Sequence, residues 1–255
     1  MKCRAAILLV ALMLAIPRAA PLAQPAPGQS PAASSFSAAQ RAEIVQILRD
    51  ALKSDPSILR DAVTALQQDD GRQQAQATQA RLQSFAPELT RTPGDPTAGN
   101  PRGDVTLVEF YDVRCPYCRS MRPVLARLLT QDRKIRVVYK DIPILGPGSV
   151  LAARAVLAAA RQGAYQKLHD TLMDGTPNIT EAVIQKAAEA DGLNWKRLRA
   201  DMDAPAIQAR IDANLRLAAA LHIEGTPAYV IGDTLLPGAV SLADLQHAVA
   251  VARAR

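Results

Sequence analysis

Hydrophobic residues recur at helical spacing in the first part of the chain and later give way to short runs typical of strands. After residue 36 they recur every three or four positions, break at Ser54-Asp55-Pro56 and then resume. The pattern comprises Ile44, Ile47, Leu48, Ala51 and Leu52 before the break, and Ile58, Leu59, Ala62, Val63 and Leu66 after it. This spacing predicts two short amphipathic helices, with Asp55 as the N-cap and Pro56 in the first turn of the second helix.

Composition characterises the next two segments. Residues 67–83 are rich in Gln, Ala and Arg, which is typical either of a solvated helical spacer or of loosely ordered chain. Residues 87–103 contain four prolines and three glycines, and this content predicts a flexible linker. We therefore expect an N-terminal helical arm over residues 36–86, a linker over residues 87–103 and a separate domain over residues 104–255.

The C-terminal segment alternates between strand and helix patterns. β-branched and aromatic residues at Val105–Tyr111 predict a buried strand, and a helix over 116–129 and a strand over 135–139 follow it. This order implies a right-handed βαβ unit. Residues 148–221 are nearly all helical by pattern, and strands at 228–231 and 235–236 precede a final helix over 242–253. The segment therefore belongs to the α/β class and carries a helical insertion at about 146–221.

The first residues predict export. Lys2 and Arg4 precede an apolar run, Ile7–Ile16, and a stretch of small residues, Ala19–Ala26, which is the pattern of a secretory signal peptide. The apolar run is too short to span a bilayer as a helix. We expect residues 1–23 to be removed, with the cleavage position open between residues 19 and 26. Residues 24–35 then form a disordered leader, and the mature protein acts in the periplasm.

Composition and charge narrow the function classes. The chain has 255 residues, of which 49% are hydrophobic, 21% charged and 4% aromatic, so a buried core is expected. Its formal net charge of +6 falls to +3 once Lys2, Arg4 and Arg18 leave with the signal peptide. Because the remaining positive residues are scattered, we expect no nucleic-acid partner. Cys3 also leaves, so the mature protein keeps two of its three cysteines.

These two cysteines form the motif Cys115-Pro116-Tyr117-Cys118, at the junction of the first strand and the helix that follows it. A helix N-terminus offers unsatisfied N–H groups and a partial positive charge to a thiolate. The pKa of Cys115 should therefore fall below the ~8.5 of a free thiol. We predict that Cys115 is the nucleophile and Cys118 the buried resolving thiol of a redox-active pair that needs no further cofactor.

Three other interpretations of the pair are open at this stage. An inert structural disulfide would close too small a loop to stabilise the chain much. Zinc would require four ligands, and no second pair of ligands accompanies the cysteines. Two thiolates alone can hold Cu(I), so copper binding at Cys115 and Cys118 stays open, although no dedicated metal site is expected.

Two stretches of the sequence resemble a known family. They are VEFYDVRCPYC, from Val108 to Cys118, and EGTPAYVIG, from Glu224 to Gly232. Over about residues 104–255 the chain resembles the DsbA-like thiol–disulfide oxidoreductases. The resemblance implies a thioredoxin-like fold with a helical insertion, here preceded by an N-terminal helical arm. It also implies exchange of disulfides with other proteins through a mixed disulfide at Cys115.

The resemblance assigns roles to residues outside the dithiol motif. It implies that the Thr226–Pro227 peptide bond is cis and lies against the cysteines, where the backbone of Thr226 pairs with a substrate strand. Glu109 matches the buried acid of the family, which relays a proton to or from Cys118; an outward-facing glutamate at the sheet edge is the alternative. Pro116 and Tyr117 belong to the docking surface. His169 and His222 could approach the site, but a core or helix-surface position is favoured for each.

The N-terminal segment bears on the type of activity. Around EIVQILRDALKSDPSILRDAVTAL the chain resembles the N-terminal region of ScsC proteins, DsbA-like proteins associated with copper tolerance, in which such helices assemble an oligomer. Two short amphipathic helices cannot bury their apolar faces alone. We therefore predict a homo-oligomer formed through residues 36–86; packing of the helices on the chain's own domain is the alternative.

An oligomer would present several Cys115 thiols to one client at high effective concentration. The predicted function is a disulfide isomerase or reductase acting on misfolded or disulfide-bonded exported proteins and kept functional by a membrane redox partner. The first alternative is a monomeric DsbA-like oxidase. The second, from another class, is a copper-binding or chaperone module.

Overall fold

The structure is a computed structural model that describes residues 36–254. The predicted signal peptide, its cleavage site and the leader lie outside the described residues. The described part divides into two compact units, residues 36–63 and residues 64–254.

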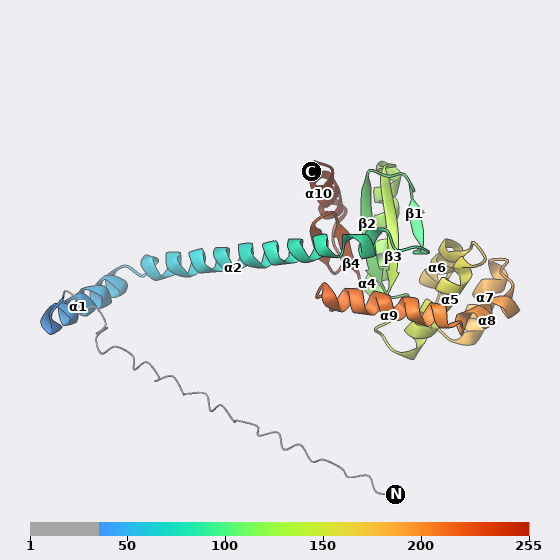
Figure 1. Cartoon of the computed structure of the whole chain (residues 1–255), viewed down its shortest axis with the longest axis horizontal. Coiled ribbons are helices and arrows are strands. Elements are labelled where there is room, and N and C mark those ends of the chain that lie inside the picture. Colours follow the sequence, from blue (N-terminus) through green and yellow to red (C-terminus); the bar gives the residue numbers. More distant parts are fainter. Residues whose placement is uncertain (1–35, 255) are drawn as a thin grey trace, which may run out of the picture. The chain divides into compact units, whose positions relative to one another are not determined.

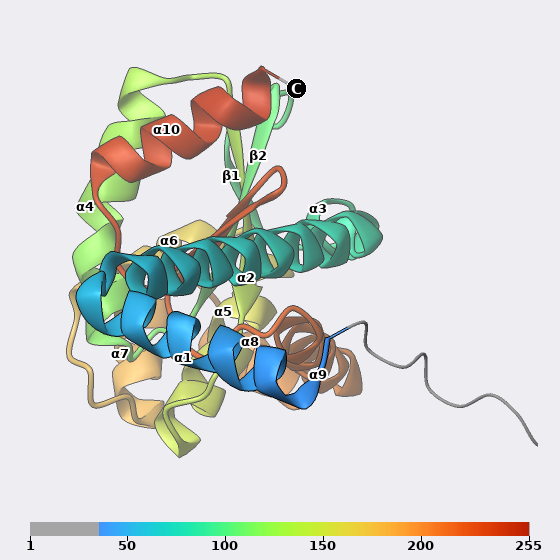
Figure 2. The ribbon, with the colours of Figure 1, turned by 90° about the vertical axis from the view of Figure 1, so that its left-hand side faces the viewer.

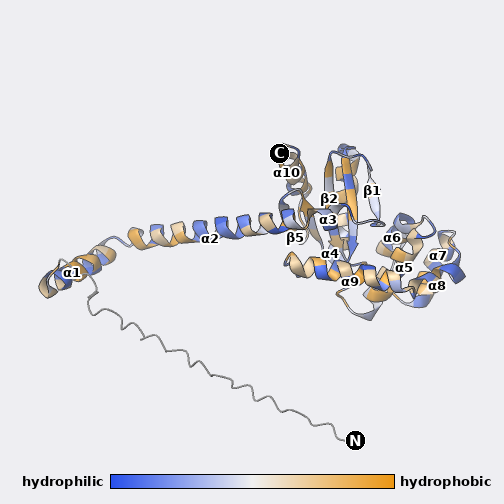
Figure 3. Ribbon diagram, in the orientation of Figure 1, coloured by the Kyte–Doolittle hydropathy of each residue, from blue (hydrophilic) through white to orange (hydrophobic). Residues whose placement is uncertain are grey.

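The first unit consists of α1 (Ala38–Ser54) and the first turns of α2 (Ser57–Ser84). Ser37 caps α1 through a capping box: its hydroxyl accepts from the Gln40 backbone N–H, and the Gln40 side chain accepts from the Ser37 N–H at 2.8 Å. No residue of α1 is buried. Figure 3 shows hydrophobic residues along α1 and the start of α2, followed by a hydrophilic stretch of α2. Both predicted helices are therefore present, but the second is not short, because it continues as one helix to Ser84. Most of the large apolar side chains are exposed, whereas Leu52 is half-buried.

A five-stranded mixed sheet organises the second unit (Figure 1). In chain order its strands are β1 (Thr97–Gly99), β2 (Val105–Tyr111), β3 (Ile135–Asp141), β4 (Ala228–Ile231) and β5 (Thr234–Pro237). In space the order is β1-β3-β2-β4-β5. The central strand β2 pairs in parallel with β3 and antiparallel with β4. Helix α4 (Pro116–Gln131) connects β2 to β3, which is the βαβ unit that the sequence predicts.

Alternating side chains of the sheet form two separate cores. On one face Leu107, Tyr111 and Tyr139 pack with residues of α4, of the insertion and of α10 (Leu242–Arg253). Helices α4 and α10 lie beside each other here (Figure 2). On the opposite face Val108 and Phe110 pack with residues of α9 (Pro205–Ala220) and of the end of α2. Glu109 therefore faces α4 and the dithiol motif, because side chains alternate along a strand.

Five helices are inserted between β3 and β4. They are α5 (Pro147–Ala160), α6 (Tyr165–Asp174), α7 (Glu181–Ala190), α8 (Trp195–Met202) and α9 (Pro205–Ala220). The alanine-rich α5 contacts four of its neighbours, α6, α7, α8 and α9, because small side chains allow close approach on several sides. A thioredoxin-like sheet with this helical insertion confirms the predicted fold class.

The segment 87–103 differs from the flexible linker predicted for it. It begins within α3 (Ala86–Thr90), and β1 adds an antiparallel strand to β3, with Thr97 opposite Val138. The side chain of Asp95 is 2% exposed and accepts hydrogen bonds from Lys140 and Arg210, each at 2.5 Å. Gly99 has φ +69°, and a Cβ there would lie 2.5 Å from the Ile135 carbonyl. The segment is thus ordered by strand pairing and by the ion pairs of Asp95, although it is rich in glycine and proline.

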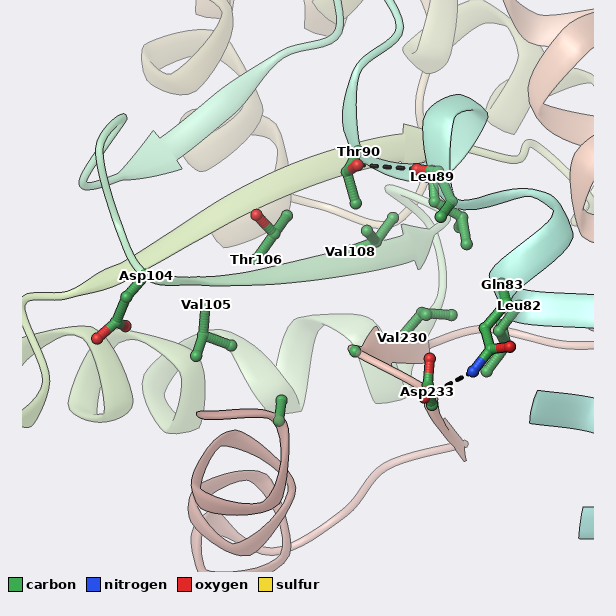
Figure 4. Close-up of a pocket in the computed structure, with 13 residues that line it drawn as sticks. Leu82, Gln83, Leu89, Thr90, Asp104, Val105, Thr106, Val108, Val230 and Asp233 are labelled. Atoms are coloured by element: carbon green, nitrogen blue, oxygen red, sulfur yellow. Dashed lines mark hydrogen bonds between the residues drawn. The ribbon is translucent and has the colours of Figure 1, made fainter. Parts of the chain in front are cut away.

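The polar stretch 67–83 is helical throughout, as one of its two interpretations predicted. Its last turns belong to the second unit, since Leu82 is 2% exposed and the Gln79 and Gln83 amides both donate to Asp233 at 3.0 Å. Figure 4 shows Gln83 directed at Asp233 beside a cavity of about 290 Å³, lined also by residues of α3, β2 and β4. The arm therefore joins the domain before residue 86.

Candidate active site

The two cysteines lie where β2 leads into α4. Cys115 is the N-cap of α4 with an extended backbone (φ −67°, ψ 121°), and Pro116 occupies the first helical turn. The Cys115 carbonyl accepts the first helical hydrogen bond from the Arg119 N–H at 3.1 Å. Both cysteines are free thiols; Cys115 is 4% exposed and Cys118 is fully buried. Cys118 is thus sealed from solvent, and Cys115 is only slightly accessible.

The surroundings of Cys115 favour its thiolate. A hydrogen bond from the Cys118 thiol is the largest influence, and the Thr226 side chain and the backbone N–H groups of Cys118 and Tyr117 act in the same direction. Burial opposes them, yet together they lower the pKa of Cys115 to about 5. A thiol with this pKa is almost wholly ionised at neutral pH and is both an available nucleophile and a good leaving group.

Cys118 and Glu109 are shifted in the opposite direction. Burial raises the pKa of Cys118 strongly, and the neighbouring Cys115 and Glu109 raise it further. Burial also raises the pKa of Glu109 to about 8, although the Tyr229 hydroxyl donates to its Oε1 at 3.2 Å and Arg122 favours its charged form. Glu109 is 5% exposed, so it is a buried acid and not a glutamate at the solvated sheet edge. A neutral thiol next to a carboxyl that titrates near neutrality can exchange a proton with it.

The second predicted motif meets the first. The Thr226–Pro227 peptide bond is cis, as the resemblance implies, and Cys115 Sγ lies 3.2 Å from the Thr226 carbonyl oxygen. Tyr117 projects from the first turn of α4 and is 63% exposed. The structure therefore brings together the dithiol motif, Thr226 and Pro227, with Glu109 buried behind Cys118.

Besides Tyr117, which the sequence analysis assigned to the docking surface, two exposed apolar residues that it missed follow β3. Among the described residues outside 36–66, the exposed large hydrophobic side chains are Tyr117, Ile144 and Leu145. Asp112, which is 2% exposed, accepts hydrogen bonds from the Ile144 and Leu145 N–H groups at 2.9 and 3.1 Å. The sequence offered one signal for this surface. Asp112 stands three residues before Cys115, and the apolar pair Ile144-Leu145 follows the next strand. We call Tyr117, Ile144 and Leu145 the apolar rim.

Two arginines that flank the motif were also missed. The Arg119 guanidinium donates only to backbone carbonyls, at 2.9 Å to Val113, 2.6 Å to Gly175, 3.0 Å to Leu172 and 3.2 Å to Thr176. Arg114 donates from Nε to the Pro177 carbonyl at 3.0 Å and from Nη1 to the Leu145 carbonyl at 2.6 Å. These contacts fix the end of α6 and the apolar rim against the turn that carries Cys115. Their partners are distant in sequence, so no local pattern reveals them.

The two histidines occupy different places. His169 is 4% exposed, its Nδ1 lies 2.9 Å from Asp170 Oδ1, and burial lowers its pKa. It packs among Tyr111, Tyr139 and Tyr165, with ring centroids 5.0 to 5.9 Å away. This is the core position that the sequence favoured. His222 has φ 57° and lines a cavity of about 250 Å³ together with Thr226.

A buried carboxyl lies close to these rings. Asp141 accepts hydrogen bonds from the Tyr111 hydroxyl at 2.6 Å and the Tyr165 hydroxyl at 3.1 Å, and burial raises its pKa to about 7. These bonds join the ends of β2 and β3 to α6. Within residues 36–254, no group of three or more His, Cys, Asp or Glu side chains is arranged to hold a metal ion.

Comparison with known proteins shows the family of the chain. Residues 106–250 match the model of the DSBA-like thioredoxin domain. The chain belongs to the DsbA-like thioredoxin family. Residues 40–76 of this DsbA-like chain also match the copper resistance protein ScsC N-terminal domain.

Solved structures show the same two similarities. A thioredoxin-like oxidoreductase from Silicibacter pomeroyi is 43% identical with a TM-score of 0.65, over 66% of this chain and 98% of that one. Proteus mirabilis ScsC in a transitional conformation is 34% identical with a TM-score of 0.63, over 86% of this chain and 98% of that one. The second match extends into the N-terminal arm.

The curated relatives differ in length from this DsbA-like chain. The Na⁺/H⁺ antiporter NhaA 3 of Salinispora tropica is 30% identical over 62% of this chain, and the chain spans 25% of the antiporter's length. The thiol:disulfide interchange protein DsbA of Bordetella parapertussis is 23% identical over 66% of this chain and 78% of its own. None of the helices within residues 36–254 is long and apolar enough to cross a membrane.

Proposed function

We propose that this chain is a thiol–disulfide oxidoreductase of the periplasm that acts on disulfides of other proteins, as an oligomeric isomerase or reductase. The observation that carries the proposal is the asymmetric dithiol: Cys115 at the start of α4 with its pKa lowered to about 5, and Cys118 fully buried. The thiolate of Cys115 attacks a client disulfide, and Cys118 resolves the mixed disulfide. The electrons reside in the cysteine pair itself, so the exchange requires no separate cofactor.

The substrate class follows from the surroundings of Cys115. The backbone of Thr226 lies against the sulfur, and an extended client segment can pair with it beside Pro227. The apolar rim offers Tyr117 in the first turn of α4 and Ile144 and Leu145 after β3. These side chains are exposed by 63%, 43% and 42%. Exposed apolar side chains next to a reactive thiol suit unfolded protein segments. Client proteins with wrong disulfides present both extended segments, which can pair with Thr226, and exposed apolar side chains, which can contact the rim.

The N-terminal arm supports an oligomer. Ile47, Leu48 and Leu59 are exposed by 60%, 55% and 52%, and each would contribute roughly 1.5–3 kcal/mol if buried. In proteins most of the stability of a helix comes from packing of its apolar face. The match of residues 40–76 to the ScsC N-terminal domain supports a shared mode of assembly, and export to the periplasm is in keeping with the predicted signal peptide.

The role of the arm is tested by comparing the wild-type mature chain with the double variant Ile47→Lys/Leu59→Lys. The variant Gln76→Lys, at an exposed polar position of α2, serves as the control. Light scattering should give an oligomer for the wild type and the control and a monomer for the double variant. Unscrambling of ribonuclease with wrong disulfides should be lost with the oligomer. A monomeric wild type, or full unscrambling by a monomeric double variant, would contradict the role of the arm.

The same ribonuclease assay separates the alternatives. Rapid oxidation of reduced ribonuclease without unscrambling would favour the monomeric oxidase. The variant Cys115→Ala should lose all exchange activity; if it kept the cellular function, a copper-binding or chaperone role would replace the catalytic one. Membrane reductants and oxidants that restore turnover would identify the class of the redox partner.

A further inference from the structure

A cavity of about 250 Å³ adjoins Thr226, whose carbonyl oxygen lies 3.2 Å from Cys115 Sγ. One of its walls is the segment 222–226, and the other is the end of β5 together with Gly238. The Gly238 N–H donates to the Pro227 carbonyl at 2.8 Å, so the second wall is joined directly to the proline beside the dithiol. We call this cavity the Thr226 pocket.

The first wall of the Thr226 pocket begins at a fixed turn. Helix α9 ends in a Schellman motif, in which the Ile223 N–H donates to the Ala218 carbonyl at 2.9 Å and the His222 N–H to the Ala219 carbonyl at 3.1 Å. His222 has φ 57°, the left-handed conformation that glycine usually supplies in this motif. Ile223 is buried in the core that it shares with α9. The turn therefore fixes the direction in which the chain leaves α9 toward Thr226.

The lining combines an apolar floor with one acidic side chain. Ile223 and Ala228 are buried and Leu235 is half-buried, and all three belong to or pack against the core on the face of the sheet opposite α4. Glu224 is exposed and makes no hydrogen bond or ion pair with any other residue between 36 and 254. The residues that line the pocket in the described part of the chain include no lysine or arginine. The charge of Glu224 is therefore free to pair with a ligand.

This combination suits a basic side chain with a long stem. A client strand that pairs with the backbone of Thr226 directs successive side chains to opposite faces of the sheet, and those on the α9 face meet the pocket. Lysine and arginine lay their methylene stems on apolar surface and keep the charged head in water, where Glu224 supplies the opposite charge. An acidic client side chain would meet a like charge at the same place.

We propose that the Thr226 pocket selects clients that carry a lysine or arginine close to the cysteine under attack. The stem of this side chain lies over Ile223 and Leu235, and its charge lies beside Glu224. The inference rests on the proposed thiol–disulfide exchange and adds a preference among its clients. Glu224 is a specificity-determining residue and takes no part in the making or breaking of bonds.

The test uses short peptides with a single cysteine that forms a disulfide with thionitrobenzoate. The residue at each position flanking the cysteine is lysine, glutamate, leucine or alanine in turn. The Cys115 thiolate attacks the peptide sulfur, thionitrobenzoate leaves as a coloured thiolate, and Cys118 then displaces the peptide thiolate as the Cys115–Cys118 disulfide forms. At the position that reaches the pocket, the second-order rate constant of the wild type should favour lysine over glutamate by about fivefold, the effect of one exposed ion pair.

Three variants assign this preference to one side chain. Glu224→Gln should bring the ratio of the lysine rate to the glutamate rate close to unity, and Glu224→Lys should reverse it in favour of glutamate. Glu189→Gln removes an exposed acid of α7 that is not part of the pocket and should keep the wild-type ratio. Because each ratio compares two peptides on the same protein, it does not depend on the fraction of a variant that is folded.

Equal rates for the lysine and glutamate peptides at every position in the wild type would overturn the proposal. A lysine preference that persists in Glu224→Lys would overturn the role of this residue. Faster reaction of the leucine peptide than of the lysine peptide would assign the pocket to an apolar side chain and overturn the selection by charge. Absence of thionitrobenzoate release from all peptides would instead contradict the proposed function.

Discussion

The acidity of Cys115 provides a quantitative test of the site. Its largest source is the hydrogen bond from the Cys118 thiol, and the backbone N–H groups of the helix start contribute less. Cys118→Ala removes this donor and leaves the fold of α4 intact, because alanine is a strong helix former. Cys118→Ser keeps a donor, and a hydroxyl donates more strongly than a thiol. The two variants therefore isolate one hydrogen bond.

The size of the effect follows from the energy of that bond. A hydrogen bond to a charged group contributes about 1.5–3 kcal/mol, and the weak S–H donor belongs at the lower end. One pKa unit corresponds to about 1.4 kcal/mol, so the pKa of Cys115 should rise by about one unit from about 5 in Cys118→Ala. At pH ~5.5 the ionised fraction then falls from about three quarters to about one quarter. Cys118→Ser should stay at or below the wild-type value.

The ultraviolet absorbance of the thiolate, followed from about pH 3 to about pH 9, gives the pKa directly. The rate of alkylation by iodoacetamide over the same range gives an independent value. Equal midpoints for the wild type and both variants would refute the reasoning and assign the shift to the Thr226 side chain and the backbone N–H groups at the helix start. A rise in Cys118→Ser as large as that in Cys118→Ala would show that packing, and not hydrogen bonding, matters.

Three further predictions concern the pH dependence, the ordered 87–103 segment and the apolar rim. Burial raises the pKa of Glu109 from 4.5 to about 8. The contribution of this carboxyl to stability is therefore complete below the unfolded-state pKa of 4.5 and is lost as the pH rises to the folded-state pKa of about 8. The free energy of unfolding of the oxidised wild type should therefore fall by up to about 1.4 kcal/mol per pH unit between them, and urea titrations of Glu109→Gln should lack this component. Asp95→Ala leaves the buried Lys140 uncompensated and should destabilise the protein by about 3–5 kcal/mol in chemical denaturation; an effect below about 1 kcal/mol, the median for surface pairs, would contradict the structural role of the ion pair. Leu145→Ser should raise KM for scrambled ribonuclease and leave the rate with a small disulfide unchanged; equal losses for both substrates would contradict a docking role.

The sequence predicts the central elements well because their signals are local. Val105–Tyr111 carries its own strand pattern, and the break before Cys115 marks the start of α4. The pairing of the dithiol motif with Thr226–Pro227 came from a family resemblance. No spacing rule connects residues that are 111 positions apart, as the bond from Cys115 to Thr226 does.

The segment 87–103 shows why composition misled. Its prolines and glycines predict flexibility, yet β1 pairs with β3 and the Asp95 side chain is 2% exposed. The partners that order it, Lys140 and Arg210, lie 45 and 115 residues further along the chain. The same holds for Arg119, whose acceptors include carbonyls more than 50 residues away.

The sequence by itself determined the α/β class, the dithiol at a helix start and the amphipathic arm, since each depends on neighbours within a few turns or on a short motif. Only the tertiary structure decided that Glu109 is buried, that Ile144 and Leu145 are exposed together with Tyr117, and that Glu109 lines a cavity. The physical reason is that burial, and with it the pKa of a carboxyl or thiol, depends on which distant segments remove water from it. Local patterns specify the elements, and their packing specifies the chemistry.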